Sequence, residues 1–158
     1  MTVSYWGFDG AVHRGPLVVN ERVASDVLDV FRRLYAARFR IRHIALAAKY
    51  HPKDDRWDSN RDTTAAFNCR PVTDSPGSLS QHSYGWAIDI NPLQNPYVRS
   101  DGSVLRAAAK VYRDRSLGAP GMILPGGVVV RAFEHIGWGW GGNFSSIKDY
   151  MHFSLTGN

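Results

Sequence analysis

The chain has 158 residues, of which 44% are apolar and 12% aromatic, and its formal net charge is +5. That length and apolar content predict one domain, residues 1–158, with one packed core, and argue against intrinsic disorder. The sequence has no run of roughly 18 apolar residues that could form a membrane helix, and no basic helix with interleaved aromatic residues, so we expect no membrane insertion and no nucleic-acid partner.

A helix over residues 21–38 is the first element that the sequence predicts. Asn20 can cap its N-terminus, where the helix dipole favours the negative charge of Glu21. Apolar residues follow at spacings of three and four, which gives the helix one apolar stripe to bury. The stripe consists of Val23, Val27, Val30, Phe31 and Leu34.

Short strands separated by polar turns are predicted in the middle of the chain. Residues 41–50 are rich in branched and aromatic side chains, as in a strand, whereas residues 51–66 are typical of a polar loop. A short strand at 67–72 and a turn at 74–78 follow. Cys69, the single cysteine, excludes an internal disulfide and a cysteine zinc site, and we expect its thiol to be buried as a small hydrophobic group.

Further strands and a second helix are predicted in the C-terminal part of the chain. Alternating side chains indicate the strands, an Asp-Gly pair indicates a hairpin, and a glycine marks the end of the helix. Because helices and strands do not alternate regularly and hairpins are present, the sequence favours an α+β fold, with helices packed on an antiparallel sheet, over a doubly wound parallel sheet. The predicted elements are a strand at 86–91, a hairpin around Asp101-Gly102 between 97–99 and 103–105, a helix at 126–136 ended by Gly137, and a strand at 150–155.

Three side chains that could hold one zinc ion stand in two short motifs. Zinc binds imidazole nitrogen and carboxylate oxygen, and a catalytic zinc takes three protein ligands and leaves a fourth position for water. His82, Asp89 and His152 supply such a set. Because neighbouring side chains on a helix are three or four residues apart, His82 and Asp89 at a spacing of seven would be too distant on a helix to bind one ion. We therefore expect His82 on a turn, Asp89 on the strand that follows, and His152 on a neighbouring strand. The motifs are Ser80-x-His82-x-x-Gly85-x-Ala87-x-Asp89 and Asp149-x-x-His152.

The two motifs resemble those of the M15 family of zinc peptidases, over roughly residues 66–155. That family includes D-alanyl-D-alanine carboxypeptidases, vancomycin-resistance D,D-dipeptidases and the L-alanyl-D-glutamate endopeptidases of phage endolysins. The resemblance implies an α+β fold of the hedgehog and D-Ala-D-Ala-peptidase type, one zinc ion per chain, and peptidoglycan stem peptides as substrate. Many family members carry a glutamate as the base; the aspartate at position 149 resembles the phage endopeptidase pattern more closely.

Asp149 is the candidate general base. Zinc held by two imidazoles and one carboxylate keeps a positive charge and can lower the pKa of a bound water toward roughly 7. Asp149 would take the proton of that water and pass it to the leaving amine. Since residues three apart cannot share a strand face, we expect a bend between Asp149 and the strand of His152.

Arg70 is the candidate cation for the oxyanion that develops during peptide hydrolysis. The resemblance implies this role, because family members carry an arginine before the first histidine of the motif. A surface salt bridge is the alternative role for Arg70.

Four further residues are candidates for substrate binding. Ser80 can hydrogen-bond near the metal or cap a turn. Trp138 and Trp140 alternate with glycines and can either wall a groove that substrate enters or pack in the core. Tyr84, next to the first motif, is a further candidate for the pocket.

We therefore expect a monomeric zinc metallopeptidase that hydrolyses peptidoglycan stem peptides in the bacterial cell wall, in particular an L-alanyl-D-glutamate endopeptidase of the endolysin type. A D-alanyl-D-alanine carboxypeptidase is the nearest alternative. A non-catalytic wall-binding module with a zinc ion belongs to another class, although structural zinc is usually closed by four protein ligands. The N-terminus lacks a secretory signal. We therefore expect either that the protein is exported in the manner of a phage lysin or that the chain is a piece of a longer secreted protein.

Overall fold

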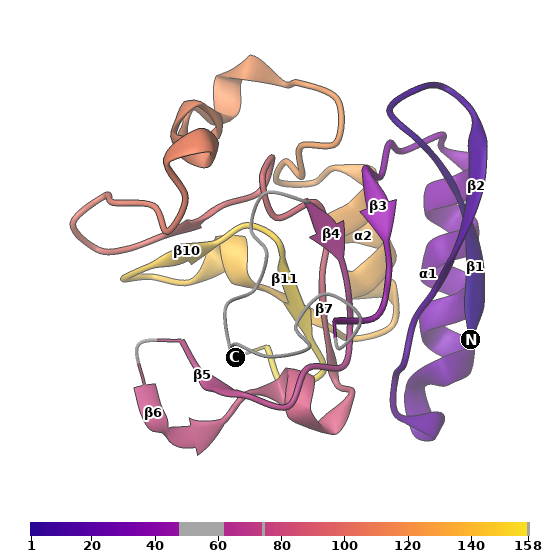
Figure 1. The fold of residues 1–158 in the computed structure, drawn as a ribbon, viewed down its shortest axis with the longest axis horizontal. Coiled ribbons are helices and arrows are strands. Elements are labelled where there is room, and N and C mark those ends of the chain that lie inside the picture. The colour runs from indigo at the N-terminus through magenta and orange to yellow at the C-terminus, as the bar shows by residue number, and fades with distance from the viewer. Residues whose placement is uncertain (48–61, 74, 158) are drawn as a thin grey trace.

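A hairpin and a helix form the N-terminal part of the fold. The computed structural model describes residues 1–47, 62–73 and 75–157 (Figure 1). Strands β1 (Thr2–Trp6) and β2 (Val12–Pro16) pair in antiparallel fashion, and helix α1 (Ala24–Ala36) lies alongside them. Helix α1 packs on β1 on one side and on the second helix, α2 (Val128–His135), on another.

A helical segment follows the Asn20 cap, as predicted, but α1 itself covers only Ala24–Ala36 of the expected residues 21–38. The Asn20 side chain accepts a hydrogen bond from the Arg22 N–H at 3.1 Å, and a 3-10 turn, η1 (Glu21–Val23), leads from there into the helix. The helix ends at Ala36, and Arg38 adopts a φ of 54°, which helical backbone does not. The predicted apolar stripe is buried in full: Val23, Val27, Val30, Phe31 and Leu34.

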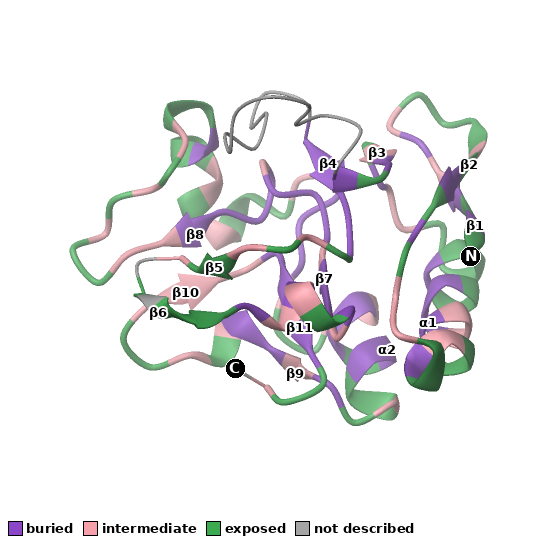
Figure 2. Cartoon of the chain, turned by 60° about the horizontal axis from the view of Figure 1, so that its bottom comes forward, coloured by how far each residue is buried: buried purple, intermediate pink, exposed green. Residues whose placement is uncertain are grey.

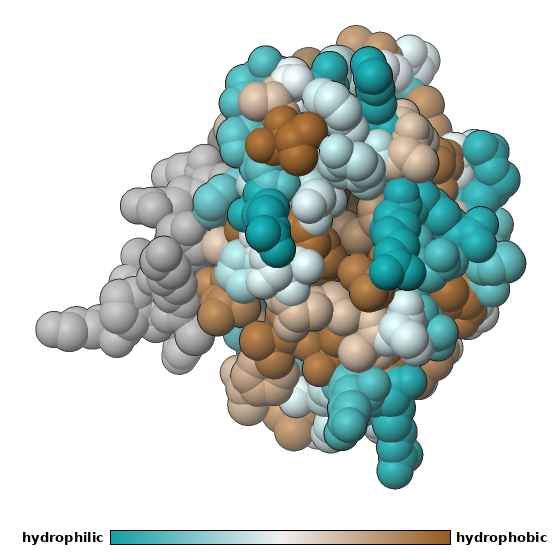
Figure 3. All heavy atoms as spheres, turned by 90° about the vertical axis from the view of Figure 1, so that its right-hand side faces the viewer, coloured by the Kyte–Doolittle hydropathy of each residue, from teal (hydrophilic) through white to brown (hydrophobic). Residues whose placement is uncertain are grey.

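Figure 3 shows the face of the molecule that β1, β2 and α1 present to solvent. Hydrophilic and hydrophobic side chains are interspersed on it. Single apolar side chains among polar ones are normal on the surface of a folded protein.

A three-stranded antiparallel sheet at the centre of the fold positions the later elements. Its order is β7 (Ala87–Asp89), β11 (His152–Ser154), β9 (Gly139–Trp140). The register sets His152 directly opposite Asp89 and Phe153 opposite both Ile88 and Trp140. Figure 2 shows these strands among the buried parts of the chain. Two residues that are far apart in the sequence are thereby fixed as cross-strand neighbours.

Shorter strand pairs surround this sheet. Most are antiparallel, and β3 with β4 is parallel. The described residues therefore confirm an α+β architecture in which antiparallel pairing prevails. The pairs are β3 (His43–Ile44) with β4 (Thr63–Thr64), β5 (Pro71–Val72) with β6 (Ser75–Leu79), and β8 (Tyr97–Val98) with β10 (Lys148–Asp149). The 3-10 turns besides η1 include η4 (Gln81–Tyr84), η5 (Ala107–Arg113), η6 (Arg115–Leu117) and η7 (Gly141–Asn143).

Aromatic rings fill the core between α2 and the central sheet. The rings of Phe133 and Phe153 stack with their centroids 4.1 Å apart, and Trp138 packs against Phe133 at 5.6 Å. Helix α2 ends as predicted, because Gly137 adopts a φ of 77° and donates its N–H to the Glu134 carbonyl at 2.9 Å. The predicted turn at Asp101-Gly102 is present, and the Gly102 N–H donates to the Arg99 carbonyl. The strand expected at 103–105 is reduced to an isolated bridge between Val98 and Val104, and β8 pairs with β10 instead.

Several predicted element boundaries are wrong. The strand expected at 41–50 is described only at 43–44, and its last three residues lie outside the described part of the chain. Residues 63–64, expected in a loop, form β4, and residues 75–79, expected in a turn, form β6. Each of these segments is a strand because it pairs with another strand, β4 with β3 and β6 with β5, although its own residues do not favour a strand.

The remaining strands are shorter than predicted, and one burial prediction fails. The strand expected at 67–72 is limited to 71–72, that at 86–91 to 87–89, and that at 150–155 to 152–154. Cys69 is exposed rather than buried. Among residues 1–47, 62–73 and 75–157, no helix has both the length and the apolar character that crossing a membrane requires.

Candidate metal centre

His82, Asp89 and His152 converge from three separate elements. His82 lies in the turn η4, Asp89 is the last residue of β7, and His152 is the first residue of β11. Ser80 caps η4 by accepting the His82 N–H at 3.3 Å, and Gly85 ends it with a φ of 69°. A side chain at Gly85 would collide with the backbone of residues 19–20, so glycine is required there. The arrangement of turn, strand and neighbouring strand is the one that the sequence predicts.

The three side chains direct one donor atom each at a common point. His82 Nε2 lies 3.2 Å from His152 Nδ1, and each of these nitrogens lies 3.1 Å from Asp89 Oδ1. A tetrahedral zinc with ligands at about 2.0–2.1 Å separates its donor atoms by about 3.3 Å. The observed triangle fits that size. Coordination of zinc by these residues stays a prediction.

The orientation of the His82 ring suits a metal ligand. Its Nδ1 lies 2.6 Å from the Ala66 carbonyl oxygen and can donate to it, which leaves the Nε2 lone pair toward the other two donors. His82 is buried, at 2% exposure, so its ring has little freedom to turn away. A hydrogen bond of this kind is the usual second contact of a zinc-bound histidine.

The charge state of Asp89 also suits a metal ligand. Burial by itself raises the pKa of Asp89, but the adjacent His82 and His152 outweigh burial and hold this pKa well below its usual range. The carboxyl is therefore ionised at neutral pH. Two imidazoles and one carboxylate form a hard and borderline donor set that zinc prefers.

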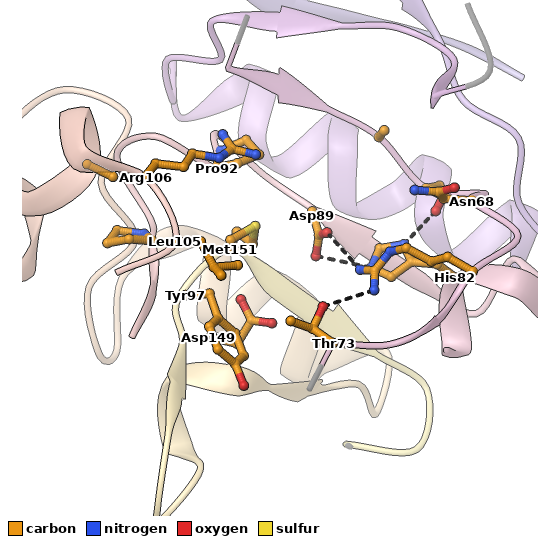
Figure 4. Close-up of a pocket in the computed structure, with 15 residues that line it drawn as sticks. Asn68, Thr73, His82, Asp89, Pro92, Tyr97, Leu105, Arg106, Asp149 and Met151 are labelled. Atoms are coloured by element: carbon orange, nitrogen blue, oxygen red, sulfur yellow. Dashed lines mark hydrogen bonds and ion pairs between the residues drawn. The ribbon is translucent and has the colours of Figure 1, made fainter. Parts of the chain in front are cut away.

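A cavity of about 180 Å³ opens at this site, and two of the three donor residues, His82 and Asp89, line it (Figure 4). Its wall consists of residues from four segments of the chain, 65–73, 82–97, 105–109 and 149–151. His82, Asp89, Arg70 and Asp149 all reach it. The other described residues that line it are Ala65, Ala66, Asn68, Thr73, Pro92, Pro96, Tyr97, Leu105, Arg106, Ala109 and Met151.

Asp149 stands in the cavity wall on strand β10, just before the bend at residues 150–151 that the sequence predicts. Its Oδ1 is buried and has no hydrogen-bond partner among the described residues. Gly141 lies directly behind it: a Cβ there would sit 2.5 Å from the Asp149 carbonyl oxygen and 2.9 Å from its Cβ. The close approach of η7 thus holds Asp149 against the cavity.

Burial raises the pKa of Asp149 to about 7, and the charge of Asp89 adds to this effect, whereas His152 and Arg70 oppose it. A carboxyl with such a pKa exchanges protons readily near neutral pH, which is the property that a general base and acid needs.

This raised pKa predicts how the stability of the metal-free protein depends on pH. Between pH 4 and 7 the unfolded chain ionises Asp149 while the folded chain keeps it protonated, so the free energy of unfolding falls as pH rises and levels off above the folded pKa of about 7. Asp149→Asn lacks this loss. We expect its stability advantage over wild type to grow from near zero at pH 4 to about 2–4 kcal/mol at pH 8, measured by urea unfolding in a chelator. An advantage that did not change with pH would contradict the shift.

Arg70 lies at the metal end of the cavity. Its Nη2 is 4.0 Å from Asp89 Oδ2, and its Nη1 donates to Thr73 Oγ1 and to the Pro71 carbonyl, each at 3.2 Å. The side chain is a third exposed. The guanidinium therefore lies beside the Asp89 carboxylate and also lines the cavity, and its role toward the oxyanion stays a prediction.

The other four candidates for substrate binding do not line the cavity. Ser80 is buried as the cap of η4, and Trp138 and Trp140 are 2% and 4% exposed in the aromatic core. Tyr84 is exposed and stacks on Trp86 with ring centroids 5.4 Å apart. For the two tryptophans, the alternative of core packing describes the observed position.

Sequence reasoning missed most of the cavity wall. Pro92, Tyr97, Leu105 and Met151 are ordinary apolar residues with no motif around them, and only long-range pairing brings them together. The Ala66 carbonyl, which faces His82, is a backbone group and leaves no signal in the sequence. Arg106 could have been noted as a charge near the predicted hairpin.

A comparison with known protein families agrees with the geometry. A sequence model of the peptidase M15 family, described as D-alanyl-D-alanine carboxypeptidase, matches residues 73–155. This range contains both motifs and Asp149. No solved structure gives a significant match to the chain.

Proposed function

The chain belongs to the M15 family of peptidases, and on that premise we propose that it is a zinc peptidase that hydrolyses stem peptides of bacterial peptidoglycan. The observation that carries this proposal is the convergence of His82, Asp89 and His152 at 3.1–3.2 Å beside a cavity that also holds Asp149. Three donors and an open side are typical of catalytic rather than structural zinc.

Each residue of the site has a chemical task in this proposal. Zinc held by His82, Asp89 and His152 would polarise the scissile carbonyl and activate a water for attack. Asp149 accepts a proton at its carboxyl and delivers it to the leaving amine, a task suited to a buried carboxyl in the cavity wall. Arg70 supplies a fixed positive charge for the oxygen of the former carbonyl.

The bond that is cleaved has two candidates within the proposal. We favour the bond between L-alanine and D-glutamate, because an aspartate base at position 149 resembles the phage endopeptidases of the family. The description of the matched family favours the bond before a terminal D-alanine. We further propose a fold of the hedgehog and D-Ala-D-Ala-peptidase type, one catalytic domain over residues 1–158, and a monomer that acts in the cell wall.

Product analysis on purified peptidoglycan tests this function. We expect zinc-dependent release of soluble fragments, loss of release in a chelator, and recovery when zinc is added back. Mass spectrometry then assigns the bond, because an L-alanyl-D-glutamate endopeptidase leaves alanine on the glycan whereas a carboxypeptidase releases a single alanine. Full activity after complete metal removal would contradict the proposal, and zinc-dependent binding to the wall without any soluble product would support a non-catalytic binding module instead.

A further inference from the structure

Three arginines lie outside the cavity lining, on the segment that follows α1. Arg38 and Arg42 are exposed, and Arg40, between them, is half-buried. The residues that alternate with them face inward, since Ile41 is fully buried and Phe39 packs against the core. The three arginines therefore project away from the core, and we call them the arginine surface.

Aromatic rings restrain all three guanidinium groups. The Cζ atoms of Arg38 and Arg40 lie 5.0 and 5.8 Å from the centroid of the Trp6 ring. The Cζ atom of Arg42 lies 4.7 Å from the centroid of the Phe8 ring. Such cation–π contacts are attractive and hold the long side chains in place. The side chains therefore lose less conformational freedom when a ligand binds than unrestrained arginines would lose.

The backbone of the segment is fixed as well. The Ile41 N–H donates to the Trp6 carbonyl at 2.9 Å. The side chain of Asn91, which is fully buried, accepts the N–H of Arg42 at 2.9 Å and donates to the carbonyl of Arg40 at 2.8 Å. The fold thus sets the arrangement of the three positive charges before any ligand binds.

The charges of the arginine surface are not neutralised by neighbouring carboxylates. Within residues 1–47, 62–73 and 75–157, no carboxylate forms an ion pair with any of the three arginines. Asp9, in the adjoining β1–β2 turn, pairs with His13 at 2.9 Å instead. Burial raises the pKa of Asp62, and the charge of Arg42 counteracts part of this rise from a longer distance. A guanidinium that lacks an ion-pair partner is suited to bind phosphate through two parallel hydrogen bonds.

From this arrangement we propose that the arginine surface binds a phosphodiester polymer of the bacterial cell wall. Three guanidinium groups side by side suit a chain of repeated phosphates better than a single phosphate, because several contacts to one chain reinforce each other. The choice of a wall polymer rests on the proposed function, whereas the surface itself lies outside the cavity lining. Binding there would keep the protein at the wall that contains its substrate.

The aromatic contacts favour this polymer over a single-stranded nucleic acid. Proteins bind single strands largely by stacking the bases on aromatic side chains. The Trp6 ring already stacks on Tyr35, with ring centroids 5.8 Å apart, in addition to its contacts with Arg38 and Arg40. The arginine surface therefore offers charged donors for phosphates rather than open rings for bases.

Binding of fluorescently labelled poly(glycerol phosphate) to the zinc-loaded wild-type protein tests the inference. Fluorescence anisotropy at salt concentrations between about 50 and 200 mM gives the binding constant. We expect the logarithm of this constant to fall linearly with the logarithm of the salt concentration, with a slope of about −2, which is about 0.7 for each of three phosphate contacts.

Variants assign this binding to the arginine surface. The double variant Arg38→Gln/Arg42→Gln should bind the polymer about 10- to 100-fold more weakly, with a salt slope of about −0.7. The variant Arg38→Lys/Arg42→Lys should keep the slope but bind more weakly than wild type, because lysine lacks the paired donors of arginine. Arg22→Gln/Arg131→Gln removes the same charge from exposed positions on η1 and α2 and should bind as wild type.

Absence of polymer binding by the wild type at about 50 mM salt, where such contacts are strong, would overturn the inference, and this measurement needs no variant to fold. Equal affinities of Arg38→Gln/Arg42→Gln and the control variant would overturn it as well. So would tighter binding of a single-stranded oligonucleotide or of anionic phospholipid vesicles, or equal competition by free glycerol phosphate at the same phosphate concentration. Cleavage of short stem peptides is measured separately, so the proposed function and this inference can fail independently.

Discussion

Replacing His82 by alanine is expected to lower the zinc affinity of the protein by about 100- to 1000-fold and to remove peptidase activity at limiting zinc. The estimate follows from dividing the roughly 10–16 kcal/mol of zinc binding in four-ligand sites among the ligands, which gives about 3–4 kcal/mol each. His82 is buried and directs Nε2 at the donors of Asp89 and His152, so no nearby side chain of the site replaces it. Metal analysis after equilibrium dialysis against buffered zinc measures the change.

His135→Ala is the matched control for this experiment. His135 is exposed at the end of α2 and belongs neither to the three donors nor to the cavity lining, so its loss should leave zinc content and activity as in the wild type. Because His82→Ala also removes the hydrogen bond to Ala66, Asp89→Asn serves as a second variant that keeps the side-chain volume. Wild-type zinc affinity in folded samples of both variants would contradict the assignment of these ligands.

Replacing Asp149 by asparagine is expected to leave zinc content unchanged and to lower kcat by about 100- to 10,000-fold, the usual contribution of a general acid and base. Asp149 lies outside the triangle of His82, Asp89 and His152, so the metal does not depend on it. The amide fills the same volume in front of Gly141 but cannot take or give a proton at pH 7. Steady-state kinetics on the cleaved stem peptide, with metal content measured on the same samples, separates the two effects.

Asp149→Glu distinguishes proton transfer from simple packing. This variant keeps a carboxyl at position 149, on a side chain that is one methylene longer. We expect Asp149→Glu to have a kcat between those of Asp149→Asn and the wild type. If Asp149→Asn kept kcat near the wild-type value, another residue would have to be the base. If Asp149→Asn lost its zinc, the carboxyl would be a ligand rather than a base.

The candidate metal centre was the most predictable part of this protein. On a helix, His82 and Asp89 would lie about two turns, roughly 10 Å, apart and could not bind one ion. This distance favoured a turn followed by a strand, and the structure has η4 followed by β7. The spacing of Asp149 and His152 required a bend, which lies at residues 150–151. These are local features, in which a few neighbouring residues determine the backbone. The stripe of α1 and the glycine that ends α2 were predictable for the same reason.

The cavity wall was not predictable, because it depends on contacts between distant segments. Tyr97 reaches the site only through the pairing of β8 with β10, some fifty residues later. Residues 63–64 became a strand because β3 was available as a partner, against the polar composition around them. Trp138 and Trp140 were ambiguous in the sequence, since a large ring beside glycine suits a groove and a core equally, and they pack in the core.

The most direct test of this account is a crystal structure of the purified protein with diffraction data on both sides of the zinc absorption edge. The account predicts one anomalous peak per chain, bonded to His82 Nε2, Asp89 Oδ1 and His152 Nδ1 at about 2.0–2.2 Å, with its remaining coordination position open to the cavity. A structure from zinc-containing solution with no peak at these atoms, or with a fourth protein ligand that closes the site, would contradict it.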